Sequence, residues 1–101
     1  MEGVGFLEEL EAVIRDRLRR MPEGSYTAYL ARRGIGYAAR KLGEEAVETI
    51  VEALRGGDEA LVNEAADLVY HLMVLLALRG LSIRDVVAEL ERRHRVRERE
   101  A

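Results

Sequence analysis

The chain has 101 residues, a formal net charge of −3 and no cysteine. A chain of this length has room for one domain with a modest core, so a two-domain enzyme is excluded. Without cysteine, a disulfide framework, a thiolate metal site and a cysteine nucleophile are all excluded.

The composition, 49% hydrophobic and 35% charged, is typical of a soluble globular protein. The longest mainly apolar run, residues 65–78, is shorter than the roughly 20 residues that span a bilayer, so we expect no membrane segment. The amino-terminal residues show no targeting pattern, and we therefore expect a cytoplasmic protein. The negative net charge gives no general attraction to nucleic acid, so an anionic ligand needs local cations or a metal.

The amino-terminal part of the chain predicts one long helix and one short one. Apolar residues recur there at three- and four-residue spacing, at Phe6, Leu7, Leu10, Val13, Ile14 and Leu18. We expect Glu8 and Glu11 of this helix on its solvated face, and the Met-Pro-Glu-Gly run at 21–24 to end it. A short helical segment with a Ser or Thr cap follows over 25–33, and Gly34 and Gly36 predict a bend after it.

Three further helices follow, with short connections. A helix over 37–55 carries an apolar stripe of Ala39, Leu42, Ala46, Ile50 and Leu54. Gly56 as a C′ residue and Asp58 as an N-cap predict the turn into a helix over 58–79, which ends at Gly80. Ser82 with Asp85 resembles a capping box that starts the last helix. The predicted fold class is all-α, an antiparallel four- to five-helix bundle that forms a single domain over 1–101.

Two carboxylate pairs share the same three-residue spacing. Asp67 interrupts an otherwise apolar helix surface, and a buried carboxylate needs a compensating partner. Glu64 is about 60° away around that helix, so both side chains can converge on one point. Glu45 and Glu48 repeat the spacing on the preceding helix, and the short Gly-Gly-Asp connection lets the two pairs face each other. Oxygen ligands of this kind favour a hard divalent cation, Mg²⁺ or Mn²⁺.

Other polar residues allow two interpretations each. Tyr70 and His71 can be satisfied core residues or can orient a carboxylate. Arg40 and Lys41 can meet phosphate oxygens, or Lys41 can pair with Glu45 along the helix. The charged segment at 91–100 alternates in sign, which predicts a solvated helix end rather than a nucleic-acid tail.

Three motifs connect the chain to a known family. They are Ser-Tyr-Thr at 25–27, Lys-Leu-Gly-Glu-Glu-Ala-Val-Glu at 41–48, and Asn-Glu-Ala-Ala-Asp-Leu-Val-Tyr-His-Leu at 63–72. With them, the sequence from about residue 6 to 93 resembles the phosphoribosyl-ATP pyrophosphohydrolases of histidine biosynthesis. The paired acidic pattern alone is similar to the wider all-α nucleoside triphosphate pyrophosphohydrolase superfamily, which includes house-cleaning enzymes of the MazG type.

The resemblance implies that the chain hydrolyses phosphoribosyl-ATP to phosphoribosyl-AMP and pyrophosphate with Mg²⁺. Carried over position by position, it implies a metal-binding set of Glu45, Glu48, Glu64 and Asp67. The candidate catalytic residues, which would hold the attacking water, are Glu44 and Glu45. The candidate substrate contacts are Ser25, Tyr26, Thr27 and Lys41. The alternatives are a house-cleaning nucleoside triphosphate pyrophosphohydrolase and a non-catalytic helical dimerisation module.

Self-association is predicted separately, from the apolar helix at 65–78. It is apolar nearly all round, and its apolar surface is larger than one small bundle can bury. We therefore expect a homodimer with its sites near the interface. The expected partners are a nucleotide substrate and a second copy of the chain, with neither nucleic acid nor membrane.

Overall fold

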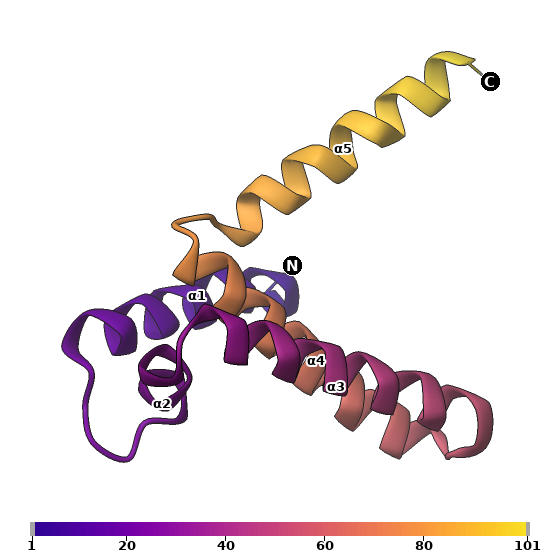
Figure 1. Ribbon diagram of the computed structural model, residues 1–101. Helices are drawn as coiled ribbons and strands as arrows, with labels where there is room; N and C mark the ends of the chain where they lie inside the picture. Colours follow the sequence, from indigo (N-terminus) through magenta and orange to yellow (C-terminus); the bar gives the residue numbers. More distant parts are fainter. Residues whose placement is uncertain (1, 101) are drawn as a thin grey trace.

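The computed structural model describes residues 2–100, with side chains at residue 3 and from 5 to 96. The described chain contains five α-helices and no strand, which confirms the all-α prediction. The helices are α1 (Glu2–Arg20), α2 (Tyr26–Arg33), α3 (Ile35–Arg55), α4 (Asp58–Leu78) and α5 (Ile83–Glu100) (Figure 1). The outermost residues of the predicted domain, and the last side chains of the predicted charged segment at 91–100, lie outside the described part.

Helix α2 begins and ends where its sequence predicts. Ser25 is its N-cap, and the Ser25 hydroxyl accepts a hydrogen bond of 3.1 Å from the Ala28 N–H. Gly34 alone separates α2 from α3, with a φ of 97° that L side chains rarely adopt. The predicted bend is therefore confirmed at Gly34, whereas Gly36 lies inside α3.

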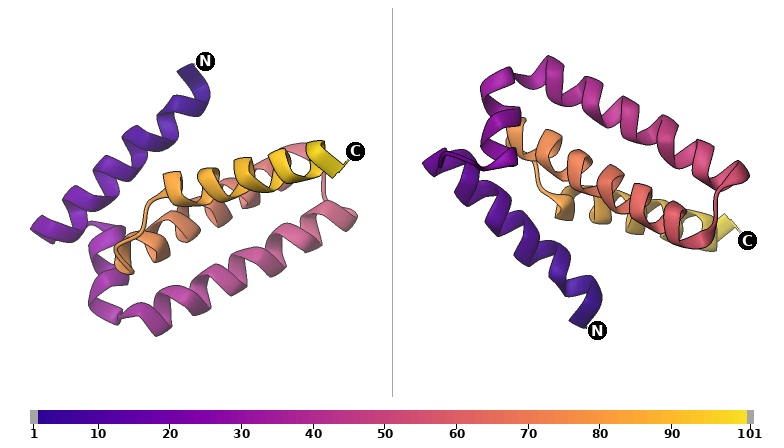
Figure 2. Two further views of the ribbon diagram at one scale, coloured as in Figure 1. Left: turned by 90° about the horizontal axis from the view of Figure 1, so that it is seen from above. Right: turned by 90° about the horizontal axis from the view of Figure 1, so that it is seen from below.

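Helices α3 and α4 form an antiparallel hairpin (Figure 2). The prediction that Asp58 caps α4 is wrong, because Gly57 holds that position in an extended conformation. The Gly57 carbonyl already accepts the first helical hydrogen bond, from the Leu61 N–H at 3.0 Å. Asp58 therefore lies inside the first turn, where its negative charge interacts favourably with the positive end of the helix dipole.

The predicted turn between α4 and α5 is confirmed in detail. Gly80 has a φ of 74°, and the Leu81 N–H donates to the Leu76 carbonyl at 2.8 Å, which is the Schellman arrangement. At the start of α5, the Ser82 N–H donates to an Asp85 carboxylate oxygen at 2.9 Å. This is the reciprocal bond of the predicted capping box.

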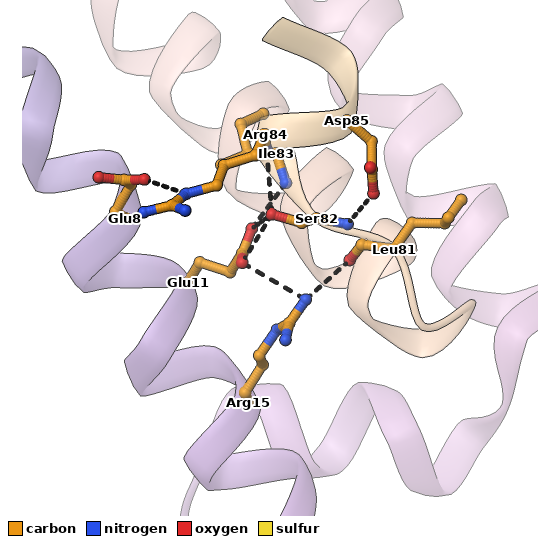
Figure 3. A network of polar contacts seen from close by, with 8 residues as sticks. All are labelled: Glu8, Glu11, Arg15, Leu81, Ser82, Ile83, Arg84 and Asp85. Atoms are coloured by element: carbon orange, nitrogen blue, oxygen red, sulfur yellow. Dashed lines mark hydrogen bonds and ion pairs between the residues drawn. The ribbon is translucent and has the colours of Figure 1, made fainter. Parts of the chain in front are cut away.

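The face of α1 that carries Glu8 and Glu11 contacts the start of α5 (Figure 3). The Glu11 carboxylate accepts from the Ser82 hydroxyl at 3.0 Å and from the Ile83 N–H at 2.6 Å. Glu8 forms an ion pair with Arg84. Glu8 is exposed, as expected, although it also pairs with a residue 76 positions away. The expectation of a solvated side chain is wrong for Glu11, which is half-buried against residues 71 and 72 positions away.

A small core lies where α1, α2 and α4 meet. Ile14, Leu30, Met73 and Val74 are each at most 2% exposed. Around them lie the partly buried residues Leu7, Leu10, Leu18, Tyr37, Tyr70, Ala77, Leu78 and Ile83. This core holds α2 against the carboxyl-terminal half of α4, and so it positions the residues described below.

The rest of the molecule is open. Its radius of gyration is 15.5 Å, against about 13 Å for a compact domain of this length. Helix α5 projects away from the other helices (Figure 1). On the hairpin, Ile50, Leu54 and Val62 are 58%, 82% and 69% exposed. The predicted stripe on α3 is therefore only partly covered within one chain.

Helix α4 also bears on the expectation of no membrane segment. At 21 residues it is, by length and composition alone, the one helix of the described chain that could cross a membrane. The apolar run at 65–78 is only the later part of this helix, which begins at Asp58. The central helix of a soluble helical protein has the same length and composition, and Glu64, which α4 contributes to a group of three carboxylates with Glu45 and Glu48, favours that interpretation.

Candidate metal centre

Three of the predicted metal ligands come together between α3 and α4. Glu45 and Glu48 lie on successive turns of one face of α3, and Glu64 faces them from α4. One carboxylate oxygen from each lies within 4.8 Å of the other two. The antiparallel hairpin creates this arrangement, because it places the middle of α4 beside the middle of α3 (Figure 2).

The three carboxylates differ in exposure. Glu45 is buried, with 8% of its surface exposed, whereas Glu48 is exposed and Glu64 is half-buried. The Glu64 Oε2 atom is itself buried and has no hydrogen-bond partner among the described residues. A buried anionic oxygen without a partner is costly, and a cation held between the three carboxylates would satisfy it. The donor set fits a hard divalent ion.

The charges of the cluster act on one another. The pKa of Glu45 is raised above its ordinary value, first by burial and then by the charges of Glu48 and Asp67. The pKa of Glu64 is also raised, first by burial and then by the charges of Glu48 and Glu45. Without a cation the folded cluster therefore holds protons more tightly than the unfolded chain does. A cation would release them.

The fourth predicted ligand, Asp67, lies beside the cluster but outside the 4.8 Å group. Its charge contributes to the raised pKa values of both Glu45 and Glu64, so its carboxylate is close to both. The prediction that Asp67 is buried in an apolar surface is wrong for the single chain, where Asp67 is exposed. The apolar pattern of α4 indicates a surface to be covered, but none of the described elements of this chain covers it at Asp67.

Glu44 and Lys41 form an ion pair on α3. Lys41 Nζ lies 3.2 Å from a Glu44 carboxylate oxygen, and Arg40 Nε lies 3.6 Å from the other. Of the two interpretations of Lys41, pairing within the helix is the one observed, although its partner is Glu44 and not Glu45. Glu44 is exposed and lies outside the carboxylate cluster.

The Ser-Tyr-Thr motif lies at the start of α2, where it contacts α4. Ser25 uses its hydroxyl as the helix cap. Thr27 is buried, at 5% exposure, and its hydroxyl hydrogen-bonds that of Tyr70. Tyr26 Oη lies 2.9 Å from His71 Nε2. Two residues that the sequence left open, Tyr70 and His71, thus receive their partners from this motif.

His71 joins the motif to the acidic turn of α4. Its Nδ1 atom lies 2.7 Å from the Asp67 carbonyl oxygen. Because a carbonyl only accepts, Nδ1 carries the proton, and in the neutral ring Nε2 then accepts from the Tyr26 hydroxyl. His71 is buried, at 6% exposure, and its ring edge contacts Tyr26. The pair therefore fixes α2 against the turn of α4 from which Asp67 projects.

Comparisons with known proteins match most of the chain. The family model described as phosphoribosyl-ATP pyrophosphohydrolase matches residues 7–94, which include every candidate residue above. A phosphoribosyl-ATP pyrophosphatase of Metallosphaera sedula is 61% identical over 87 residues, covering 86% of this chain and 94% of its own. A phosphoribosyl-ATP pyrophosphatase of Pyrobaculum calidifontis is 60% identical over 87 residues, covering 86% of this chain and 93% of its own. One of Ignicoccus hospitalis is 53% identical over 92 residues, covering 91% of this chain and 90% of its own.

Proposed function

The chain belongs to the phosphoribosyl-ATP pyrophosphohydrolase family, and on this premise we propose that it hydrolyses phosphoribosyl-ATP to phosphoribosyl-AMP and pyrophosphate, the second step of histidine biosynthesis. The observation that carries the proposal is the group of three carboxylates within 4.8 Å of one another. Hydrolysis of a polyphosphate needs its negative charge neutralised and its leaving group aligned, which is the chemistry that a divalent ion supplies when bound to such a group.

We propose Mg²⁺, with Mn²⁺ as an alternative, as the ion. Glu45, Glu48 and Glu64 would hold it. Asp67, whose charge acts on both Glu45 and Glu64, is the proposed fourth ligand. The buried Oε2 of Glu64 supports this assignment, because it has no hydrogen-bond donor among the described residues and most buried polar atoms in proteins have a partner.

Two neighbouring carboxylates are candidates for orienting the attacking water. Glu45 lies within the cluster, and Glu44 lies beside it on the same helix. Because Glu45 is needed as a ligand, we propose that Glu44 holds the water. Lys41, whose Nζ now pairs with Glu44 at 3.2 Å, can turn to phosphate oxygens when a polyphosphate arrives.

We propose different parts for the three residues of the Ser-Tyr-Thr motif. Tyr26 is 43% exposed, and its hydroxyl is close enough to the cluster to be affected by the charge of Glu45, so with Lys41 it can contact the substrate directly. Ser25 and Thr27 already use their hydroxyls, in the cap of α2 and in the bond to Tyr70. They support the site by holding Tyr26 in place.

A panel of substrates tests the proposed function. Purified full-length protein is incubated with phosphoribosyl-ATP and, separately, with the common ribonucleoside and deoxyribonucleoside triphosphates, and pyrophosphate is measured with and without Mg²⁺. We expect phosphoribosyl-ATP to be cleaved with the highest kcat/KM. Cleavage of a nucleoside triphosphate without cleavage of phosphoribosyl-ATP would contradict the proposal and would favour a house-cleaning enzyme.

We also propose that the chain works as a cytoplasmic homodimer. Only 17% of the apolar part of α4 is buried within one chain. Five valine, isoleucine and leucine residues of α3 and α4 are exposed: Val47, Ile50, Leu54, Val62 and Val69. A second copy packed on the hairpin would cover this surface and bring a covering element to Asp67. Light scattering of the purified protein at low micromolar concentration should give twice the mass of one chain, and a monomer would refute this assembly.

A further inference from the structure

A group of charged and aromatic side chains lies at the corner between α2 and α3. Arg33, at the end of α2, places its guanidinium carbon 4.2 Å from the centre of the Tyr37 ring. Arg40 lies on α3 one turn after Tyr37, and its guanidinium carbon is 5.2 Å from the centre of the same ring. Arg33 Nη1 also donates to the Tyr29 hydroxyl at 2.9 Å. Two arginines from two helices therefore converge on one tyrosine.

The positive charge of this corner is only partly neutralised. Among the described residues, Arg33 has no carboxylate within 4.0 Å, and Arg40 has only the 3.6 Å contact with Glu44. The corner lowers the pKa of the Tyr29 hydroxyl, mainly through the hydrogen bond from Tyr37 and also through the charge of Arg33. In an acidic chain of net charge −3, a guanidinium group without a carboxylate partner, next to a second one with a single 3.6 Å contact, indicates an anion-binding surface.

Aromatic rings connect the corner to the acidic cluster. The rings of Tyr37 and Tyr29 lie 5.9 Å apart, those of Tyr29 and Tyr26 6.0 Å, and those of Tyr26 and Tyr70 6.3 Å. All four tyrosines of the chain thus form one strip. The charge of Glu45 reaches the Tyr26 hydroxyl, where it adds to the burial that raises the pKa of that group. Along α3, Tyr37 and Glu45 are eight residues or about 12 Å apart.

The substrate of the proposed function has phosphate at both ends. Its triphosphate is at one end, and the added ribose carries a separate monophosphate at the other, with the purine between them. A nucleoside triphosphate lacks that second phosphate. A site that selects phosphoribosyl-ATP therefore needs a cation at a distance from the carboxylate cluster, with a surface for a purine and sugars in between.

Resting on the proposed function, we propose that the Arg33–Arg40 corner binds the monophosphate of the phosphoribosyl group and thereby selects phosphoribosyl-ATP over ordinary nucleoside triphosphates. The guanidinium of Arg33 is the principal ligand, because it has donors to spare and is held by Tyr29 and Tyr37 in a fixed orientation. The tyrosine strip lies between the two ends of the substrate and contacts its purine and sugars.

The test compares Arg33→Gln with Arg55→Gln in the full-length protein. Arg55 is an exposed arginine at the far end of α3, so its substitution changes the net charge equally. Arg40 is left unchanged, because it contacts Glu44. For Arg33→Gln we expect KM for phosphoribosyl-ATP to rise about tenfold or more, the loss of a charge-assisted bond, with kcat within about twofold. Arg55→Gln should leave both constants unchanged.

Two inhibitors locate the lost interaction. Ribose 5-phosphate should inhibit the wild type competitively and Arg33→Gln much less, whereas inhibition by ATP should be the same for both. An unchanged KM for phosphoribosyl-ATP in Arg33→Gln overturns the proposal, and so does an equal loss of ATP inhibition, which would place the triphosphate at Arg33. Failure of the proposed function is a different result, since the wild type itself would then not cleave phosphoribosyl-ATP.

A merely structural role of Arg33 is also distinguishable. If the arginine only fastens α2 to α3, Arg33→Gln lowers the melting temperature while KM for phosphoribosyl-ATP stays unchanged, and the proposal fails. If Arg33→Gln does not fold, Arg33→Lys keeps the charge and loses only the two-pronged geometry. Its KM should then lie above that of the wild type, and a wild-type KM in this variant overturns the proposal.

Discussion

Removing one negative charge from the acidic cluster should stabilise the metal-free protein. The substitution is Glu45→Gln, which keeps the size of the side chain and can donate to Glu48 through its amide. Glu45 is buried, and its carboxylate approaches those of Glu48 and Glu64 to within 4.8 Å. Two charges at that distance repel by about 1 kcal/mol in water and by about 3 kcal/mol at the effective dielectric constant near a protein surface.

The assay is thermal unfolding followed by circular dichroism in EDTA at pH 8, where the carboxylates are largely ionised. We expect Glu45→Gln to raise the free energy of unfolding by about 1–3 kcal/mol, and so the melting temperature by about 4 °C or more. With Mg²⁺ or Mn²⁺ the order should reverse, because the ion stabilises the wild type and has lost a ligand in the variant.

The matched control is Glu23→Gln, which removes the same charge from an exposed residue in the loop before α2. This control should change the melting temperature little with or without metal. A lower melting temperature for Glu45→Gln in EDTA would refute the reasoning, because it would mean that Glu45 is satisfied within the chain and is not repelled. Equal stabilisation of the two proteins by metal would remove Glu45 from the proposed ligand set.

Three further outcomes are expected. The raised pKa values of Glu45 and Glu64 contribute stability below their ordinary value of 4.5, and this is lost as pH rises through the raised values. The metal-free melting temperature should therefore fall as pH rises above about 4.5, and saturating Mg²⁺ should flatten this fall; a rise would contradict the cluster. Ser25→Ala should cost about 1 kcal/mol as a lost helix cap while kcat changes little, and a large loss of kcat at unchanged stability would make Ser25 a substrate contact. Tyr26→Phe should leave the buried Nε2 of His71 without its donor and lower stability by about 1 kcal/mol, measured by denaturant unfolding, and a Tyr26→Phe protein as stable as the wild type would show that this bond contributes nothing.

Local signals predicted the ends of the helices well. The Gly80 turn and the Ser82–Asp85 box depend only on residues near in sequence, and both are present as predicted. The exception is Asp58, which was predicted as the N-cap of α4, whereas Gly57 occupies that position. Contacts between distant helices could not be predicted in this way, and the ties from Glu11 to the start of α5 are an example.

In the candidate site, too, the spacing of residues along a helix was predictable and the contacts between distant helices were not. Spacing along two helices was enough to bring Glu45, Glu48 and Glu64 together, because a short connection forces adjacent helices to run antiparallel. Spacing did not predict the exposure of Asp67, since periodicity identifies which residues share a face and not what covers that face. The partners of His71 were equally beyond the sequence, because they depend on how α2 docks on α4.

Pyrophosphate release from phosphoribosyl-ATP tests the central claim most directly. The wild-type protein, stripped of metal and then supplied with Mg²⁺, is compared with Glu48→Gln under the same conditions. We predict equal amounts of pyrophosphate and phosphoribosyl-AMP from the wild type, none in EDTA, and a loss of at least about a hundredfold in Glu48→Gln. Equal turnover by Glu48→Gln and the wild type, or turnover that persists in EDTA, would contradict a carboxylate-held metal as the basis of the activity.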